Sequence, residues 1–156
     1  MKKIIIPMIL CVLLDRIYKL LCISNLNFGE SITIIKDFFN ISLLSNTGAA
    51  FNILSSNTLF LIIITLISCY IIYKYFIKDN NLNDFTKIIY GILFGGIIGN
   101  LIDRVYYGYV IDYLDFNIFG INMPIFNFAD ICIVISVLII SVQTLKGDKN
   151  AVQSRK

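Results

Sequence analysis

Four aspartates in two polar runs are the residues of this chain best suited to chemistry. They are Asp103, Asp112, Asp115 and Asp130, within FGGIIGNLIDRVYYGYVIDYLDF (Phe94 to Phe116) and FNFAD (Phe126 to Asp130). The mean hydropathy of the chain is +0.82, so these carboxylates lie in an apolar setting where ionisation is costly. Two carboxylates held close together cannot both ionise comfortably, which leaves one as an acid and the other as a base. The pattern predicts a proton-sharing pair that cleaves a peptide bond at a membrane.

Residues that would support other kinds of site are missing or scattered. The chain has no histidine, which excludes Ser-His and Cys-His nucleophile chemistry and removes the commonest metal ligand. The four cysteines lie in apolar runs without CxxC spacing, as is typical of small buried hydrophobic residues: Cys11, Cys22, Cys69 and Cys132. We therefore expect no cofactor and no metal. The net charge of +3 is too small and dispersed to indicate nucleic-acid binding.

Composition indicates that membrane helices position the aspartates. Of the 156 residues, 58% are hydrophobic and only 15% are charged. Soluble domains are less hydrophobic and carry more charged residues, so this composition indicates a membrane protein. A span needs roughly 20 mostly apolar residues. We expect an all-α integral membrane fold with four transmembrane helices, forming one membrane-embedded domain over residues 1–156. The predicted spans are 4–23, 59–77, 88–107 and 125–145.

Between the spans, two segments are expected on the outward face. Residues 24–57 contain a stretch in which apolar residues, among them Ile32, Ile34 and Ile41, alternate with the polar residues Thr33, Asn40 and Ser42, which predicts short strands. This segment should form a small extramembrane β-sheet. Residues 107–124 are predicted to be a loop. In the third span, Gly91, Gly95 and Gly99 recur every four residues, which favours close packing of a neighbouring helix.

The distribution of basic residues predicts the orientation. Most of them flank the spans on one side: Lys2, Lys3, Lys74, Lys78, Lys87, Lys146, Lys149, Arg155 and Lys156. By the positive-inside rule both termini are cytoplasmic. Asp112 and Asp130 then share a depth at the outer ends of the third and fourth spans.

The neighbours of each aspartate suggest different roles. Asp130 has no basic residue nearby in sequence, which favours a functional role. Asp103 is expected to pair with the adjacent Arg104, and Asp115 to be solvated in the loop. Composition alone does not choose between Asp112 and Asp115 as the partner of Asp130.

Polar residues near the aspartates are expected to support them. Asn127 lies three residues before Asp130, a spacing that would place both on one helical face, and Asn100 is similarly spaced from Asp103. Asp15 and Lys19 have i,i+4 spacing in the first span and are expected to anchor helix packing.

Five segments in order resemble the lipoprotein signal peptidase (signal peptidase II) family of bacterial intramembrane aspartic proteases. They are LDRIYK (Leu14 to Lys19), SNTGAAF (Ser45 to Phe51), GNLIDR (Gly99 to Arg104), GYVIDYLDF (Gly108 to Phe116) and FNFAD (Phe126 to Asp130). The resemblance covers nearly the whole chain. Arg16 is a departure, because the family usually has glutamine there.

The resemblance implies a function and a set of site residues. Asp112 and Asp130 would be the catalytic pair of a membrane aspartic endopeptidase. Supporting or substrate-binding positions would be Asp15, Lys19, Asn46, Gly48, Asn100, Arg104, Asn127 and Ala129. The substrates would be diacylglyceryl-modified prolipoproteins, cut on the amino side of the lipidated cysteine. The enzyme would be a multi-pass monomer among the lipids of the bacterial cytoplasmic (inner) membrane, with its active site near the outward face.

Two other classes of protein fit the composition. A small membrane transporter or channel subunit could use a carboxylate pair to relay protons. A non-catalytic scaffold could depend on the glycine stripe at Gly95 and Gly99 more than on the aspartates. Neither alternative accounts for the five ordered motifs.

Overall fold

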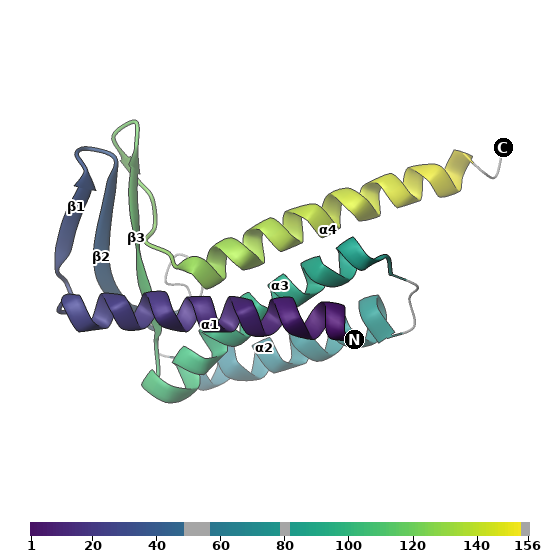
Figure 1. Ribbon diagram of the computed structural model, residues 1–156, viewed down its shortest axis with the longest axis horizontal. Helices are drawn as coiled ribbons and strands as arrows, with labels where there is room; N and C mark the ends of the chain where they lie inside the picture. Colours follow the sequence, from purple (N-terminus) through teal and green to yellow (C-terminus); the bar gives the residue numbers. More distant parts are fainter. Residues whose placement is uncertain (49–56, 79–81, 154–156) are drawn as a thin grey trace.

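A computed structural model describes residues 1–48, 57–78 and 82–153, and of residues 147–153 only the backbone. In this part of the chain the structure is mostly helical, with one small four-stranded antiparallel sheet. The helices are α1 (Lys2–Asn25), α2 (Thr58–Ile72), α3 (Asp84–Tyr107) and α4 (Phe128–Gln153), and α2 continues into the π-helical turn η2 (Tyr73–Lys78). Helix α3 is central, because it contacts α1, α2 and α4 (Figure 1).

Three of the described helices are long and apolar enough to cross a membrane. They cover Thr58–Lys78, Asp84–Tyr107 and Phe128–Lys146, and each overlaps a predicted span. Helix α1 overlaps the remaining predicted span, but Asp15, Arg16 and Lys19 interrupt its apolar run. Asp15 and Lys19 are fully buried, whereas apolar residues around them, such as Leu14, Ile17 and Leu20, are exposed.

The sheet stands at the end of α1, transverse to the helices (Figure 1). Its strands are β1 (Ser31–Ile35), β2 (Phe39–Asn46), β3 (Val110–Ile118) and β4 (Ile121–Asn122), in the order β1-β2-β3-β4. The alternating stretch before residue 47 therefore forms strands, as predicted. The predicted loop at 107–124 is wrong in its centre, where β3 and β4 form. Residues 110–113 are buried on both strand faces, so they lack the alternation that identifies a half-exposed strand.

A small apolar cluster fixes the sheet to the helices. Leu26, just after α1, packs with Leu43 of β2 and Ile111 of β3, and all three are buried. In the register of β2 with β3, Leu44 is opposite Asp112 and Asn46 is opposite Val110. The cluster and this register place the start of β3 against the bundle. Asp112 is consequently a strand residue beyond α3, not the last residue of a span.

The glycine stripe of α3 packs closely against a neighbouring helix, as predicted, and the structure shows that this helix is α1. A Cβ atom at Gly95 would lie 2.5 Å from the Cβ of Cys11 and 2.9 Å from the carbonyl oxygen of Met8. A Cβ atom at Gly91 would collide with the carbonyl oxygen of Ile4. The absence of side chains at these positions lets the two helix backbones approach closely.

The described cysteines are all free. Cys11 and Cys132 are buried between α1 and α4, with their sulfur atoms 3.9 Å apart. Cys22 and Cys69 are half-buried. The prediction of small buried hydrophobic residues is therefore confirmed for Cys11 and Cys132.

Candidate active site

Asn127 and Asp130 begin α4 with a reciprocal pair of hydrogen bonds. The backbone N–H of Asp130 donates to Asn127 Oδ1 at 3.0 Å, and the backbone N–H of Asn127 donates to Asp130 Oδ2 at 3.2 Å. This is a capping box, in which the N-cap residue and the third helical residue satisfy each other's N–H groups. The predicted common helical face is wrong, since Asn127 precedes the helix. The cap nevertheless holds the two side chains together.

Asn127 also joins Asp130 to Asp112. Its side-chain amide donates to Asp112 Oδ1 at 2.6 Å, while its backbone N–H bonds Asp130. The other oxygen of Asp112, Oδ2, accepts from Asn46 Nδ2 at 2.9 Å. One residue therefore contacts both carboxylates, which come from β3 and α4. The structure thus brings together the two aspartates that the motifs indicated.

Asn100 of α3 holds the side chain of Asp130 by a hydrogen bond. Its Nδ2 donates to Asp130 Oδ1 at 2.7 Å. Its Oδ1 accepts from Asn127 Nδ2 at 3.2 Å and from Lys19 Nζ at 3.1 Å. Since two donors face its oxygen, the amide nitrogen must face the carboxylate. Lys19 thereby orients Asn100 toward Asp130.

A largely buried cluster of four charges, of which only Arg16 is partly exposed, contacts these amides through Lys19. Lys19 Nζ is 3.0 Å from Asp15 Oδ2 and 2.6 Å from Asp103 Oδ2. Arg16 contacts the same two carboxylates, at 3.0 Å and 2.6 Å. Two acids and two cations balance, which offsets the cost of burying each charge. The prediction that Asp15 and Lys19 anchor helix packing is confirmed, because they join α1 to α3.

The predicted pairing of Asp103 with Arg104 is wrong. Adjacent residues on a helix point in different directions, so their side chains do not face each other. Asp103 faces α1, and its Oδ2 also accepts from the backbone N–H of Ile111 at 3.2 Å. The cluster is thereby bonded to the strand residue next to Asp112.

Arg104 points instead toward the segment after β2. Its guanidinium donates to the carbonyl oxygen of Gly48 at 3.0 Å. The N–H of Gly48 donates to Asn46 Oδ1 at 2.9 Å, which leaves the amide nitrogen of Asn46 for Asp112. Gly48 is buried. The motif residues Ala49, Ala50 and Phe51 lie outside the described residues.

Ala129 has a packing role beside the aspartates. It is fully buried, and a Cβ atom at Gly96 of α3 would lie 2.5 Å from its carbonyl oxygen. A Cβ atom at Gly99 would lie 2.7 Å from Asp15 Oδ2 and 3.4 Å from the Cβ of Ala129. Small residues on both helices therefore let the start of α4 approach the charged cluster.

Asp115 does not lie in a loop and is not part of this network. It lies in β3 and is half-buried, and it accepts from Ser42 Oγ at 2.8 Å and from Asn40 Nδ2 at 3.4 Å. It supports the sheet instead of Asp130. Of the two candidates that composition left open, Asp112 is the one that shares a hydrogen-bonding residue, Asn127, with Asp130.

Burial dominates the electrostatics of Asp112. It raises the pKa of this carboxyl to about 7, with a further contribution from the nearby charge of Asp130. The hydrogen bonds from Asn46 and Asn127 act in the opposite direction, because they stabilise the carboxylate. A pair with this property retains a proton near neutral pH, as acid-base chemistry by two carboxylates requires.

Tyr113 was not singled out from the sequence. Its hydroxyl accepts from the backbone N–H of Phe128 at 3.3 Å, which ties β3 to the first turn of α4. Nothing in the sequence spacing indicates this contact. Among the described residues, no group of three or more His, Cys, Asp or Glu side chains is placed to hold a metal ion.

Comparisons with known proteins give a consistent result. The family model described as "Signal peptidase (SPase) II" matches residues 7–146. Lipoprotein signal peptidases of Staphylococcus aureus strains MRSA252 and Newman are each 40% identical over 139 residues, covering 89% of this chain and 85% of theirs.

Two solved structures described as a bacterial membrane enzyme are also similar. The one determined at 2.3 Å has a TM-score of 0.86 and 39% identity, covering 94% of this chain and 89% of its own. The one determined at 1.9 Å has a TM-score of 0.81 and 39% identity, covering 91% of this chain and 92% of its own.

Proposed function

The chain belongs to the signal peptidase II family, and on that premise we propose that it removes the signal peptide from diacylglyceryl-modified prolipoproteins. Cleavage would fall on the amino side of the lipidated cysteine. The observation that carries the assignment to this chain's own residues is the contact of Asn127 with both Asp112 and Asp130. It joins two carboxylates from different elements in a site that the fold largely buries.

In the proposed mechanism the carboxylate pair activates water. One of Asp112 and Asp130 removes a proton from a water molecule, which attacks the scissile carbonyl, while the other donates a proton to the developing oxyanion. The roles exchange as the amine leaves. Because the pKa of Asp112 is raised to about 7, this carboxyl group can hold a proton for the pair at neutral pH. No metal takes part.

The supporting residues hold the pair in register. Asn46 and Asn127 each donate to one oxygen of Asp112, and Asn100 donates to Asp130. Arg104 fixes Gly48 next to the site. Hydrogen-bond donors that are fixed before the reaction avoid the cost of reorganisation during it.

We also propose that α1 is a fourth span and that the whole chain is one membrane-embedded domain. The charges of α1 lie against α3 and not toward lipid: Asp15 and Lys19 are fully buried, while Leu13, Leu20 and Leu21 are exposed. An apolar outer face with paired inner charges is what a bilayer tolerates. Both termini would be cytoplasmic and the sheet would lie outward.

The orientation can be tested with single cysteines. A membrane-impermeant thiol reagent should label Phe119→Cys in intact cells, because Phe119 is fully exposed at the β3–β4 turn. It should label Lys78→Cys only after lysis. The unmodified chain, with its own four cysteines, is the blank. The opposite pattern would reverse the proposed orientation.

A cleavage assay tests the function. Purified protein in detergent is given a diacylglyceryl-modified prolipoprotein, and the shift of the product on a gel is measured for the unmodified enzyme, Asp112→Asn and Asp130→Asn. A chelator is added to one reaction with the unmodified enzyme. We expect cleavage that survives the chelator and is absent from both variants. Cleavage by either variant near the normal rate would refute the assignment of the pair. Gel filtration in the same detergent tests the proposed monomer.

A further inference from the structure

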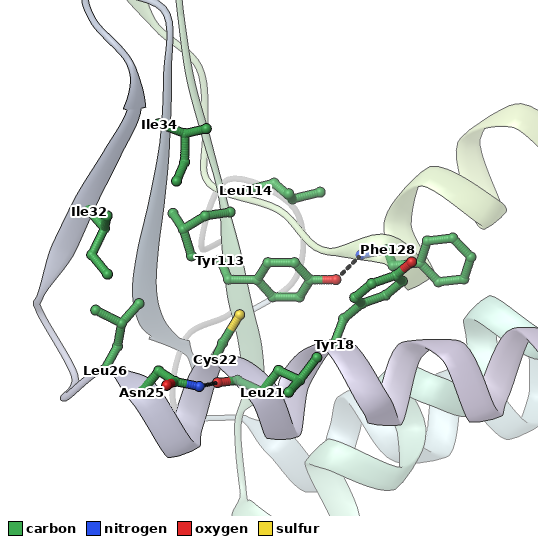
Figure 2. Close-up of a pocket in the computed structure, with 11 residues that line it drawn as sticks. Tyr18, Leu21, Cys22, Asn25, Leu26, Ile32, Ile34, Tyr113, Leu114 and Phe128 are labelled. Carbon is green, nitrogen blue, oxygen red and sulfur yellow. Dashed lines mark hydrogen bonds between the residues drawn. The ribbon is translucent and has the colours of Figure 1, made fainter.

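An apolar groove of about 450 Å³ lies where the sheet meets α1 and the start of α4. Figure 2 shows Ile32 and Ile34 of β1 and Tyr18 and Cys22 of α1 around a common space, with Tyr113 of β3 between them. Leu114 and Phe128 line it on the side of α4. Its surface is almost entirely carbon, although it lies next to a polar site.

Two of the polar side chains that line the groove, Tyr113 and Asn25, already bond protein groups. The hydroxyl of Tyr113 accepts from the N–H of Phe128 at 3.3 Å (Figure 2). The amide nitrogen of Asn25 donates to the carbonyl oxygen of Leu21 at 2.7 Å. A polar ligand would find little to bind here, whereas an apolar one would be favoured by burial alone.

The opening of the groove is continuous with the lipid-facing surface of the bundle. Leu21 is 54% exposed and Ile34 is 56% exposed, at two edges of the opening. On α1 the exposed apolar side chains continue from this point along the helix, through Ile17, Leu14 and Leu13. An apolar chain that lies in the membrane beside α1 can therefore enter the groove without crossing water.

The inner wall of the groove is also the support of the carboxylate pair. Tyr113 and Leu114 directly follow Asp112, and successive strand residues face opposite sides, so Leu114 shares the strand face of Asp112. Phe128 directly follows Asn127, the residue that contacts both carboxylates. The groove therefore adjoins the residues that form and hold the carboxylate pair.

We propose that this groove binds one acyl chain of the substrate's diacylglyceryl group. The inference rests on the proposed function, since it assigns the lipid of that substrate to a place on this chain. An acyl chain has the required chemistry, because it is flexible and wholly apolar. Its attachment to the cysteine beside the cleaved bond accounts for the position of the groove against the pair. The groove would then make cleavage depend on acyl-chain length.

The test compares kcat/KM for matched prolipoproteins with short and long acyl chains, in detergent without phospholipid. Each methylene buried by the unmodified enzyme should raise kcat/KM by about fourfold until the groove is full. Ile34→Trp, which narrows the groove, should lower kcat/KM for the long-chain substrate by about tenfold or more and leave the short-chain substrate nearly unchanged. Normal cleavage of the short-chain substrate shows that the variant is folded.

A matched control and a second variant complete the design. Ile35→Trp adds the same ring at the next, equally exposed residue of β1, which does not line the groove, and should keep the normal preference. Leu21→Ala widens the groove and should shift the preference toward longer chains. If Ile34→Trp lowered both substrates equally, or neither, the proposal would be overturned while the proposed function stood.

Two further outcomes are decisive. If preference followed the chain length of added phospholipid and not that of the substrate, the groove would belong to membrane lipid and the proposal would be wrong. If the unmodified enzyme cleaved no lipidated substrate of either length, the proposed function would fall first, and this inference with it.

Discussion

The same two helices, α1 and α3, are joined in two different ways along their length. Near the start of α1, Gly91 and Gly95 bring the backbones together, against the carbonyl oxygens of Ile4 and Met8. Toward its end, Lys19 and Arg16 of α1 each form ion pairs with Asp103 of α3 and with Asp15 of α1 itself. Close backbone packing fixes how far apart the helices lie but specifies few directions. Buried ion pairs with hydrogen bonds specify direction, and the carboxylate pair lies above them.

Gly99 marks the boundary between the two regions. Like the other glycines it has no side chain, but the space is occupied by a carboxylate, Asp15 Oδ2, which a Cβ atom would approach to 2.7 Å. The same small residue that permits close packing in one half makes room for a buried charge in the other. We infer that the glycine half holds the fold together and that the charged half orients the chemistry.

The largest expected effect comes from breaking the charged half. In Lys19→Met, Asp15 and Asp103 would share only Arg16, and one buried negative charge would be uncompensated. We expect the free energy of unfolding to fall by about 3–5 kcal/mol, measured by denaturant titration in detergent micelles. Lys3→Met is the control, because Lys3 pairs with Asp84 at an exposed position and its loss should change little. A Lys19→Met protein as stable as the unmodified one would mean that the cluster does not join the helices.

The variant Asn127→Ser distinguishes the role of Asn127 as a helix cap from its role as a hydrogen-bond donor to Asp112. Serine caps a helix about as well as asparagine, so the free energy of unfolding should change by less than about 1 kcal/mol. The serine side chain lacks the amide that donates to Asp112, so kcat should fall about 100-fold. Asn122→Ser removes an exposed asparagine that bonds Asn117 in the β3–β4 turn and should leave both quantities unchanged. If kcat survived in Asn127→Ser, Asn127 would be only a cap.

Gly95→Ala tests the glycine half. The added methyl group would meet Cys11 and the carbonyl of Met8 at 2.5 Å and 2.9 Å, so the helices must separate. We expect a loss of about 1–3 kcal/mol in the free energy of unfolding, typical of overpacking. Because the carboxylates lie beyond this contact, kcat of the folded enzyme should be retained. Val105→Ala is the control, because Val105 of α3 is 67% exposed, and it should change neither the free energy of unfolding nor kcat. A lost kcat without lost stability would contradict the division of roles.

The sequence predicted the two halves with different success. Hydropathy located, within a few residues, the three helices that are long and apolar enough to cross a membrane. The four-residue recurrence of glycine predicted close packing with a neighbouring helix, but it did not say that this helix is α1. The motifs named Asp112 and Asp130, but the role of Asp103 was predicted wrongly. Its partners Arg16 and Lys19 are more than 80 residues away in the chain, and only the packing of α1 on α3 brings them near.

The sheet shows a second limit of sequence patterns. β1 and β2 alternate and were predicted, whereas β3 was predicted as a loop. Its residues Val110 to Tyr113 are buried on both faces, by β2, α1 and the start of α4, so apolar and polar residues do not alternate. The strand that carries Asp112 was therefore the one that local periodicity could not identify. Its pairing with β2 is a long-range contact, set by the register of Leu44 with Asp112.

The smallest expected effect is a dependence of the free energy of unfolding on pH, which arises from Asp112 and not from the glycine half. The pKa of Asp112 is raised from 3.8 to about 7, so the folded protein holds a proton there that the unfolded chain releases near pH 4. The folded state binds more protons than the unfolded state in this window. Stability should therefore decrease as the pH rises from about 4 to about 7, and this contribution is absent above it.

The activity should depend on the same proton of Asp112, but at higher pH than the stability does. Above about pH 7 the pair loses its proton donor, so kcat should fall by about tenfold per pH unit. Gly95→Ala should shift the whole stability curve down and leave the pH of half-maximal kcat unchanged, because it alters no group near Asp112. Asp115→Asn is a control that also removes one carboxylate of β3. It should leave the pH dependence of kcat unchanged, since Asp115 bonds Ser42 and not the carboxylate pair. A profile of kcat that is flat from pH 6 to 9 would show that no proton held by Asp112 is needed, and would place the donor elsewhere.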